Sequence, residues 1–278
     1  MKGLRKRRVV HLAEGSVSSD YPATDTVTAI ARYDACGVPI DVADPGSAAD
    51  RITGAASRGE RLAVHLCNAH TVTLSDSDER LMTALQEADL NLSDGTPIAW
   101  LGRRRGQYSP VRGPQLVGEV VDRGREIGLK HYLYGGHDGV ADLMRARLER
   151  DFPGVAIVGT ETPPFRSLTK ADVAALADRV RASGANVLWI GLGTPRQDYL
   201  VADIRDRLDG PAVPVGAAFD FWAGSVREAP RWLHGSGVEW AYRLLKEPRR
   251  LWRRYLLGNP TFILIALRYT FSRGRAGR

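Results

Sequence analysis

The chain has 278 residues, of which 44% are hydrophobic and 26% charged, and this composition excludes an intrinsically disordered or fibrous protein. The net charge of +7 is concentrated at the two ends. Five of the first eight residues are basic, and residues 243–278 contain ten basic residues and one acid. Basic ends of this kind favour an anionic partner such as lipid, pyrophosphate or nucleic acid.

Cysteine usage and hydropathy narrow the expected location. Cys36 and Cys67 form no disulfide framework and no metal-binding spacing, which favours a reducing cytoplasm. The basic N-terminus is followed by no long apolar run, so we expect no signal peptide. The apolar run at 262–267 is far shorter than the roughly 20 residues that cross a bilayer. We therefore expect a cytoplasmic protein that lies on a membrane if it meets one.

From residue 33 onward, short apolar runs alternate with helical patterns, after a basic, weakly patterned segment (1–32) that we expect to be disordered. The expected strands are 61–67, 89–92, 131–134, 155–159, 186–190 and 213–217. The expected helices are 76–87 with Ser75 or Asp76 as its cap, one from Pro97, 114–127, one that ends at 151, 170–182, one from 194–195, and a helical C-terminal region. This alternation predicts an α/β fold in which a parallel sheet has helices on both faces.

Unusual turns follow the expected strands at their carboxyl ends: Asn68, Asp94-Gly95, Gly135-Gly136, Gly191-Leu-Gly193 and Phe219-Asp220. In parallel sheets, ligands bind outside this edge. The pattern therefore predicts one active site at the carboxyl edge of the sheet.

The turn Gly191-Leu-Gly-Thr-Pro-Arg-Gln197 joins a buried strand to a helix. Its glycines allow a ligand to approach the backbone, and the N–H groups of a helix start bind anions. Gln197 would point from the first helical turn toward a sugar or uracil. The alternative is a tight structural turn. Gly136 belongs to a second glycine turn, which fits a structural role nearly as well.

Two carboxylates stand at strand ends. Asp94 is either a turn former or helix cap, or a base that takes a proton from an acceptor hydroxyl. Asp220 is flanked by aromatic residues, and its alternative role is to cap a loop. Asp76-Ser-Asp78 has the D-x-D form of a metal site, but its place at a helix start indicates capping. We find no other metal-ligand spacing and expect no metal.

The C-terminal segment 239–255 is both cationic and aromatic. A helical wheel of residues 249–256 places four arginines on one face and Leu, Trp and Tyr on the other. Such a basic amphipathic helix suits an anionic membrane surface, where arginine binds phosphate and aromatic rings sit among the headgroups. The alternative is a surface helix that packs on its own domain.

Taken together and in this order, these motifs resemble the WecG/TagA/CpsF glycosyltransferase family (glycosyltransferase family 26). The resemblance covers most of the chain. Its segments are Gly37–Asp41, Asn68-Ala69, Ala88–Gly95, Leu133–Gly136, Phe152–Gly154, Ile157–Thr160, Gly191–Gln197, Phe219–Gly224, Ala229–Trp232 and Glu239–Arg254. We accordingly expect a catalytic core at 33–235 and a membrane-proximal appendage at 236–278.

The resemblance implies an inverting, metal-independent transferase with a Rossmann-like core and no cofactor. Such enzymes move a hexose, N-acetylmannosamine in the best-known members, from a UDP-sugar to a sugar on undecaprenyl pyrophosphate at the inner face of the membrane. Homo-oligomers occur in the family.

By resemblance, Asp94 is the general base and Gln197 lies in the donor pocket. We expect further donor contacts from the turns, at Asn68, Gly136, Gly191, Gly193 and Asp220. The family's C-terminal arginines, which meet the acceptor pyrophosphate, correspond to Arg243, Arg250 and Arg253.

Three positions depart from the family pattern: Leu66, Gln115 and Glu228 stand where the family commonly has Thr, Asp and Arg. They affect the identity of the sugar more than the reaction type, so UDP-glucose and UDP-uronic acid remain alternative donors. Outside this class, a nucleic-acid-binding protein would explain the basic ends but leaves the glycine turns without a purpose. A nicotinamide-dependent oxidoreductase would need fingerprint glycines and a ribose-binding acid, which the sequence lacks.

Overall fold

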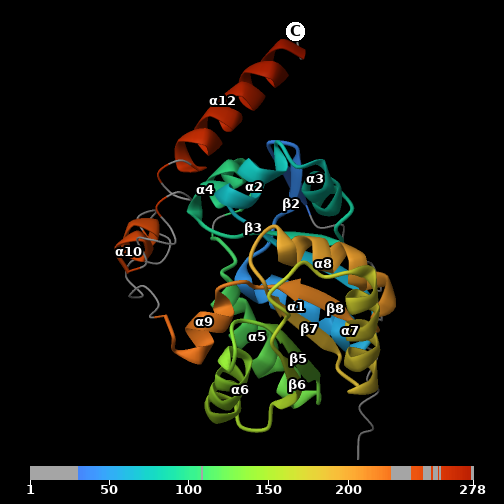
Figure 1. The fold of residues 1–278 in the computed structure, drawn as a ribbon. Helices are drawn as coiled ribbons and strands as arrows, with labels where there is room; N and C mark the ends of the chain where they lie inside the picture. The colour runs from blue at the N-terminus through green and yellow to red at the C-terminus, as the bar shows by residue number, and fades with distance from the viewer. Residues whose placement is uncertain are drawn as a thin grey trace, which may run out of the picture.

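The computed structural model describes residues 31–107, 109–226, 239–246 and 258–276, together with Trp252 and Leu256 (Figure 1). Their strands form one sheet in the order β1-β2-β4-β3-β8-β7-β5-β6. The strands are β1 Arg32–Ala35, β2 Val38–Asp41, β3 Leu62–Cys67, β4 Leu90–Ser93, β5 Lys130–Gly135, β6 Ala156–Glu161, β7 Val187–Gly191 and β8 Pro211–Pro214. Only β1 and β2 pair antiparallel, as an unexpected hairpin at the edge of the described sheet. The predicted α/β fold with a mostly parallel sheet is confirmed.

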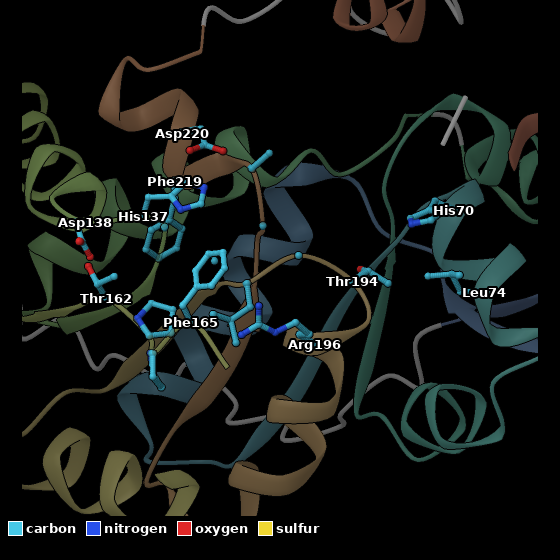
Figure 2. A pocket seen from close by; sticks show the side chains of 18 of the residues that line it. His70, Leu74, His137, Asp138, Thr162, Phe165, Thr194, Arg196, Phe219 and Asp220 are labelled. Carbon is cyan, nitrogen blue, oxygen red and sulfur yellow. The ribbon is translucent and has the colours of Figure 1, made fainter. Parts of the chain in front are cut away.

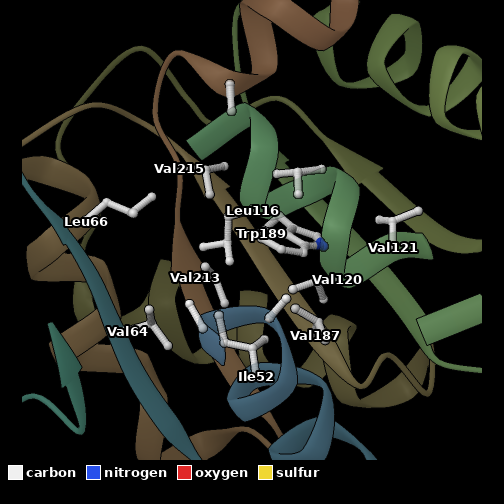
Figure 3. Close-up of a cluster of buried hydrophobic side chains, with 14 of the residues drawn as sticks. Ile52, Val64, Leu66, Leu116, Val120, Val121, Val187, Trp189, Val213 and Val215 are labelled. Atoms are coloured by element: carbon white, nitrogen blue, oxygen red, sulfur yellow. The ribbon is translucent and has the colours of Figure 1, made fainter. Parts of the chain in front are cut away.

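Helices cover both faces of this sheet, as expected. The helices on one face are α1 Pro45–Ser57, α5 Gly113–Glu126 and α6 Val140–Asp151, and those on the other include α3 Glu79–Gln86, α7 Lys170–Ala182 and α8 Arg196–Ile204. Side chains alternate between the faces along each strand. In β7, Trp189 therefore packs in the cluster with α1 and α5 (Figure 3), whereas Leu188 and Ile190 pack against α7 and α8.

The core under α5 is apolar and includes one buried imidazole. Leu116, Val120 and Val121 form the buried stripe of α5, at the helical spacing that the sequence predicts. Trp189 Nε1 donates to Nδ1 of His131 over 3.2 Å. Burial lowers the pKa of His131 to about 4, so its ring stays neutral and can accept this bond.

Two expected boundaries are wrong. The expected helix 76–87 is observed as the shorter α3, and an unexpected helix, α2 Ala69–Ser75, precedes it. The expected cap at Ser75 or Asp76 is therefore incorrect, because Asp78 caps α3 by accepting from Leu81 N over 3.0 Å. This bond confirms, for Asp78, the prediction that the segment Asp76-Ser-Asp78 caps a helix. The expected strand 213–217 is observed at Pro211–Pro214, since the chain turns at Gly216, where φ is +50°.

All the remaining elements except the one between α8 and β8 border or follow the carboxyl edge. They are α4 Thr96–Leu101, the 3-10 helices η1 Arg103–Arg105 and η2 Arg205–Arg207, α9 Ala218–Ala223, α10 Glu239–Lys246 and α12 Gly258–Ala276. In α12, Phe262 and Ile265 are buried, and the helix packs against α2. Residues 1–30 and the expected domain boundary at 235/236 lie outside the described residues. Within the described ranges, no helix is both long and apolar enough to span a bilayer.

Candidate active site

The carboxyl ends of the strands border two adjoining cavities. The large cavity has a volume of about 1180 Å³ and lies among the turns after β5, β6, β7 and β8, α2 and the start of α12. The small cavity, of about 100 Å³, lies among the ends of β3, β4 and β8 and the starts of α5 and α8. They share the lining residues Gly193, Thr194, Gly216 and Ala217. A ligand in the large cavity therefore lies next to the small one.

Backbone turns form much of the large cavity. Gly136 N donates to Gly191 O over 3.0 Å, which joins the turns after β5 and β7. At Gly191 an added Cβ would lie 2.5 Å from the ring of Phe219, so only glycine fits there without a shift. Gly193 has a φ of +73°, which an L side chain rarely adopts. The helix starts of α6 and α8 lie beside these turns, and their dipoles favour an anion there.

An exposed aromatic ring borders the large cavity from the loop between β6 and α7. Phe165 is 97% exposed and lies among the residues that line the cavity (Figure 2). Its loop is held in place, because Arg166 pairs with Asp172 at 2.5 and 2.9 Å. Arg196 also donates to Arg166 O over 3.1 Å. Phe165 is therefore an exposed aromatic side chain on an anchored loop, and the sequence reasoning did not single it out.

Asp94 and Asn68 meet in the small cavity. Asp94 N donates to Cys67 O over 2.8 Å, and Asn68 Nδ2 donates to Asp94 Oδ2 over 3.1 Å. Asn68 Oδ1 accepts from His70 N and Thr71 N as the N-cap of α2, so its side chain has a fixed orientation. The N-cap of α4 is Gly95, without a side-chain cap bond. Asp94 stands one residue before this N-cap, and Asn68 orients its half-buried carboxyl group.

Gln197 lines the same small cavity, but its side chain turns back onto the glycine turn. Its Oε1 accepts from Gly193 N over 3.0 Å, and its Nε2 lies 3.5 Å from Thr194 Oγ1. Gln197 is buried at the start of α8, after a cis peptide bond between Thr194 and Pro195. In this arrangement Gln197 holds the turn, whereas the sequence led us to expect a direct reach toward the ligand.

A buried pair joins β3, the strand that ends just before Asn68, to α8, the helix that carries Gln197. His65 Nδ1 in β3 lies 2.8 Å from Asp198 Oδ1 in α8, and both side chains are completely buried. His65 Nε2 and Asp198 Oδ2 have no hydrogen-bond partner among the described residues. Cys67 is also buried, and burial raises the pKa of its thiol well above the ordinary value. Cys67 is therefore a poor nucleophile, and the His65–Asp198 pair joins the strand before Asn68 to the helix after Gly193.

The structure brings most of the predicted site residues to one edge. Asn68, Asp94, Gly193 and Gln197 line the small cavity, and Gly136, Gly191, Gly193 and Asp220 line the large one. For Arg243 only the backbone, in α10, is described, and Arg250 and Arg253 lie outside the described residues. The sequence reasoning missed Arg112, which lines the small cavity beside Asp94. Its position just before the predicted helix at Pro114 was the available signal.

Metal-binding side chains do not gather at this edge or elsewhere in the described ranges, where no group of three or more His, Cys, Asp or Glu residues could hold an ion. The carboxyl group of Asp78, in the D-x-D segment, accepts a hydrogen bond from the Tyr199 hydroxyl.

Comparison with known proteins agrees with this geometry. The sequence model of the glycosyl transferase WecG/TagA/CpsF family matches residues 33–276. One relative is the N-acetylglucosaminyldiphosphoundecaprenol N-acetyl-beta-D-mannosaminyltransferase of Bacillus spizizenii (strain ATCC 23059 / NRRL B-14472 / W23). It is 29% identical over 193 residues, which cover 68% of this chain and 72% of the relative. Because the family match includes the sheet, both cavities and the C-terminal helices, this chain belongs to the WecG/TagA/CpsF family of glycosyltransferases.

Proposed function

We propose that this protein is an inverting hexosyltransferase that moves N-acetylmannosamine or a related hexose from a UDP-sugar to a sugar on a polyprenyl pyrophosphate. The observation that supports it best is that Asp94 and the Gly193 turn border one small cavity, which adjoins a cavity large enough for a nucleotide sugar. The relative from Bacillus spizizenii is named for N-acetylmannosaminyl transfer to a lipid diphosphate sugar.

The reaction is a direct displacement at the anomeric carbon. Asp94 takes the proton of the acceptor hydroxyl, whose oxygen forms the new bond to the anomeric carbon as the bond to the UDP oxygen breaks. Asn68 holds the carboxyl group of Asp94 toward the cavity. UDP leaves with the electron pair, and its charge is stabilised by the helix starts of α6 and α8 and by arginine side chains. No metal is required for this role.

The donor lies in the large cavity with its pyrophosphate at the glycine turns and its base on Phe165. Aromatic rings stack on nucleobases, and the loop around Phe165 is held by the Arg166–Asp172 pair. Asp220, which also lines this cavity, contacts the sugar. This orientation directs the anomeric carbon from Gly193 toward Asp94.

The polyprenyl chain of the acceptor lies in the membrane, so the protein works at the inner face of the cell membrane. Its pyrophosphate binds the C-terminal arginines Arg243, Arg250 and Arg253, and the basic appendage rests on the anionic lipid surface. The acceptor hydroxyl then enters the small cavity beside Asp94.

The test is a transfer assay with the full chain. UDP-N-acetylmannosamine, UDP-glucose and a UDP-uronic acid are each offered with a short-chain polyprenyl-diphosphate sugar, with and without a chelator. We expect transfer from one UDP-sugar, with inversion and without loss in chelator. Absence of transfer together with tight, steeply salt-dependent RNA binding would overturn the proposal in favour of a nucleic-acid-binding protein. Retention on immobilised NAD but not UDP would favour an oxidoreductase.

A further inference from the structure

The catalytic core has a second cationic and apolar surface besides the appendage. At the end of α4, Trp100 is 59% and Leu101 42% exposed, and the next residues, Arg103–Arg105 in η1, are all exposed. We propose that this α4–η1 tip, residues 100–105, docks the core onto anionic membrane lipid. The inference goes beyond the proposed function, because lipid binding can be measured without donor or acceptor.

Hydrogen bonds hold the backbone on both sides of the α4–η1 tip. On its N-terminal side, the Tyr33 hydroxyl donates to Ile98 O over 3.0 Å, and an added Cβ at Gly102 would overlap the Tyr33 ring. On its C-terminal side, buried Gln107 accepts from Ala43 N over 2.9 Å and donates to Ala43 O over 2.7 Å. The backbone that carries the exposed Trp100 and Leu101 is thus anchored on both sides.

The three arginines of the tip are unlike most arginines of the core. Arg32, Arg51 and Arg123, among many others, pair with a carboxylate. Arg103, Arg104 and Arg105 form no ion pair with any described residue. Three adjacent positive charges repel one another, and an anionic surface relieves this repulsion. Guanidinium groups next to an exposed Trp and Leu match the phosphate and acyl layers of such a surface.

The position of the tip also fits the proposed chemistry. α4 begins two residues after Asp94 and has six residues, so its far end lies about 9 Å along the helix from its start. Docking of Trp100 among the headgroups would bring Asp94 close to the interface, where a lipid-linked pyrophosphate presents its sugar. Membrane contact through the core would therefore orient the base as well as hold the protein.

The C-terminal helix extends the same surface. Helices α4 and α12 contribute to the same buried hydrophobic cluster, through Ile98 of α4 and through Phe262 and Ile265 of α12. α12 exposes Ile263, Leu264 and Leu267. Figure 1 places α4 and α12 at one end of the molecule and α6 at the other. A flat anionic lipid surface suits two neighbouring elements that each expose apolar side chains.

The experiment measures partition of the full chain into vesicles of phosphatidylcholine alone and of phosphatidylcholine mixed with phosphatidylglycerol. The test variant is Arg103→Ala/Arg104→Ala/Arg105→Ala. The matched control is Arg145→Ala/Arg147→Ala/Arg150→Ala on α6, which removes the same charge from arginines that have carboxylate partners. We expect the test variant to lose on the order of 100-fold in partition to the mixed vesicles, and the control to lose far less.

A second pair of variants isolates the apolar contribution. Trp100→Ala/Leu101→Ala should weaken partition, whereas Leu143→Ala, at an exposed leucine of α6, should not. Transfer to a detergent-dispersed short-chain acceptor should be unchanged in the arginine variant, which shows that the core is folded and active. If the triple arginine variant of the tip binds the mixed vesicles as well as the α6 control does, the proposal is overturned. It is also overturned if the natural chain does not bind these vesicles. Loss of self-association or of RNA binding with unchanged vesicle binding would overturn it too.

Discussion

The two cavities at the carboxyl edge share one border but differ in the residues that line the rest of each. The large cavity is formed mostly by backbone turns, with Gly136, Gly191 and Gly193 where side chains would clash or strain. The small cavity is formed by functional side chains, with Asp94 held by Asn68. The difference indicates a division of labour in which backbone groups bind a donor and side chains carry out proton transfer. Three of the predictions below each affect one cavity and should spare the other, and one removes a buried pair that joins β3 to α8.

Replacement of Asp94 by Asn should have the largest effect on turnover. The amide cannot accept the acceptor proton, so kcat should fall by about 10² to 10⁴. UDP affinity, measured by calorimetry, should stay nearly the same because UDP lies in the large cavity. If the Asp94→Asn enzyme retains its rate, Asp94 is not the base.

His65→Leu should break the buried pair that joins β3 to α8. Asp198 would be left buried without its partner, which costs on the order of 3–5 kcal/mol in the free energy of unfolding. Urea titration measures this loss. The double variant His65→Leu/Asp198→Leu is the control, since it leaves no unpaired buried carboxyl group and should recover much of the stability. If the single variant is as stable as the natural protein, the pair has no structural importance.

Gly191→Ala should damage the large cavity while the base stays in place. The added methyl group would lie 2.5 Å from the Phe219 ring, and such overpacking costs about 1–3 kcal/mol. We expect weaker UDP binding together with a lower melting temperature. Gly258→Ala is the matched control, because Gly258 lines the same cavity and an added Cβ there meets no described residue within 4 Å. Equal UDP affinity in the two variants would contradict the close fit at Gly191.

Phe165→Ala should have the smallest effect and should concern donor binding alone. Loss of a stacked base weakens binding by about 1–3 kcal/mol, whereas kcat at saturating donor should remain unchanged. Phe165→Tyr should bind UDP like the natural chain, since the ring is retained. If Phe165→Ala binds UDP normally, the base lies elsewhere in the cavity, and UDP binding by the natural chain still supports the proposed function.

Much of the fold follows from local patterns. The expected helix 170–182 is observed with the same bounds, because its apolar spacing and its Thr169 cap are both local signals. Helix α1 was not expected. Its sequence is rich in small residues, and burial of Ala48, Ala49 and Ile52 against the sheet stabilises it instead. The β1–β2 hairpin was also missed, since its pairing with β4 is a contact distant in sequence.

The sequence alone determined which residue types stand at the ends of the strands, because periodicity and glycine turns are properties of short segments. It therefore predicted the edge at which Asn68, Asp94 and Gly193 lie. Only the tertiary structure decided what those side chains do. Asn68 Nδ2 donates to the carboxyl group of Asp94, and Gln197 turns back to Gly193 N. A side chain's partners depend on segments far away along the chain, and packing alone brings these segments together.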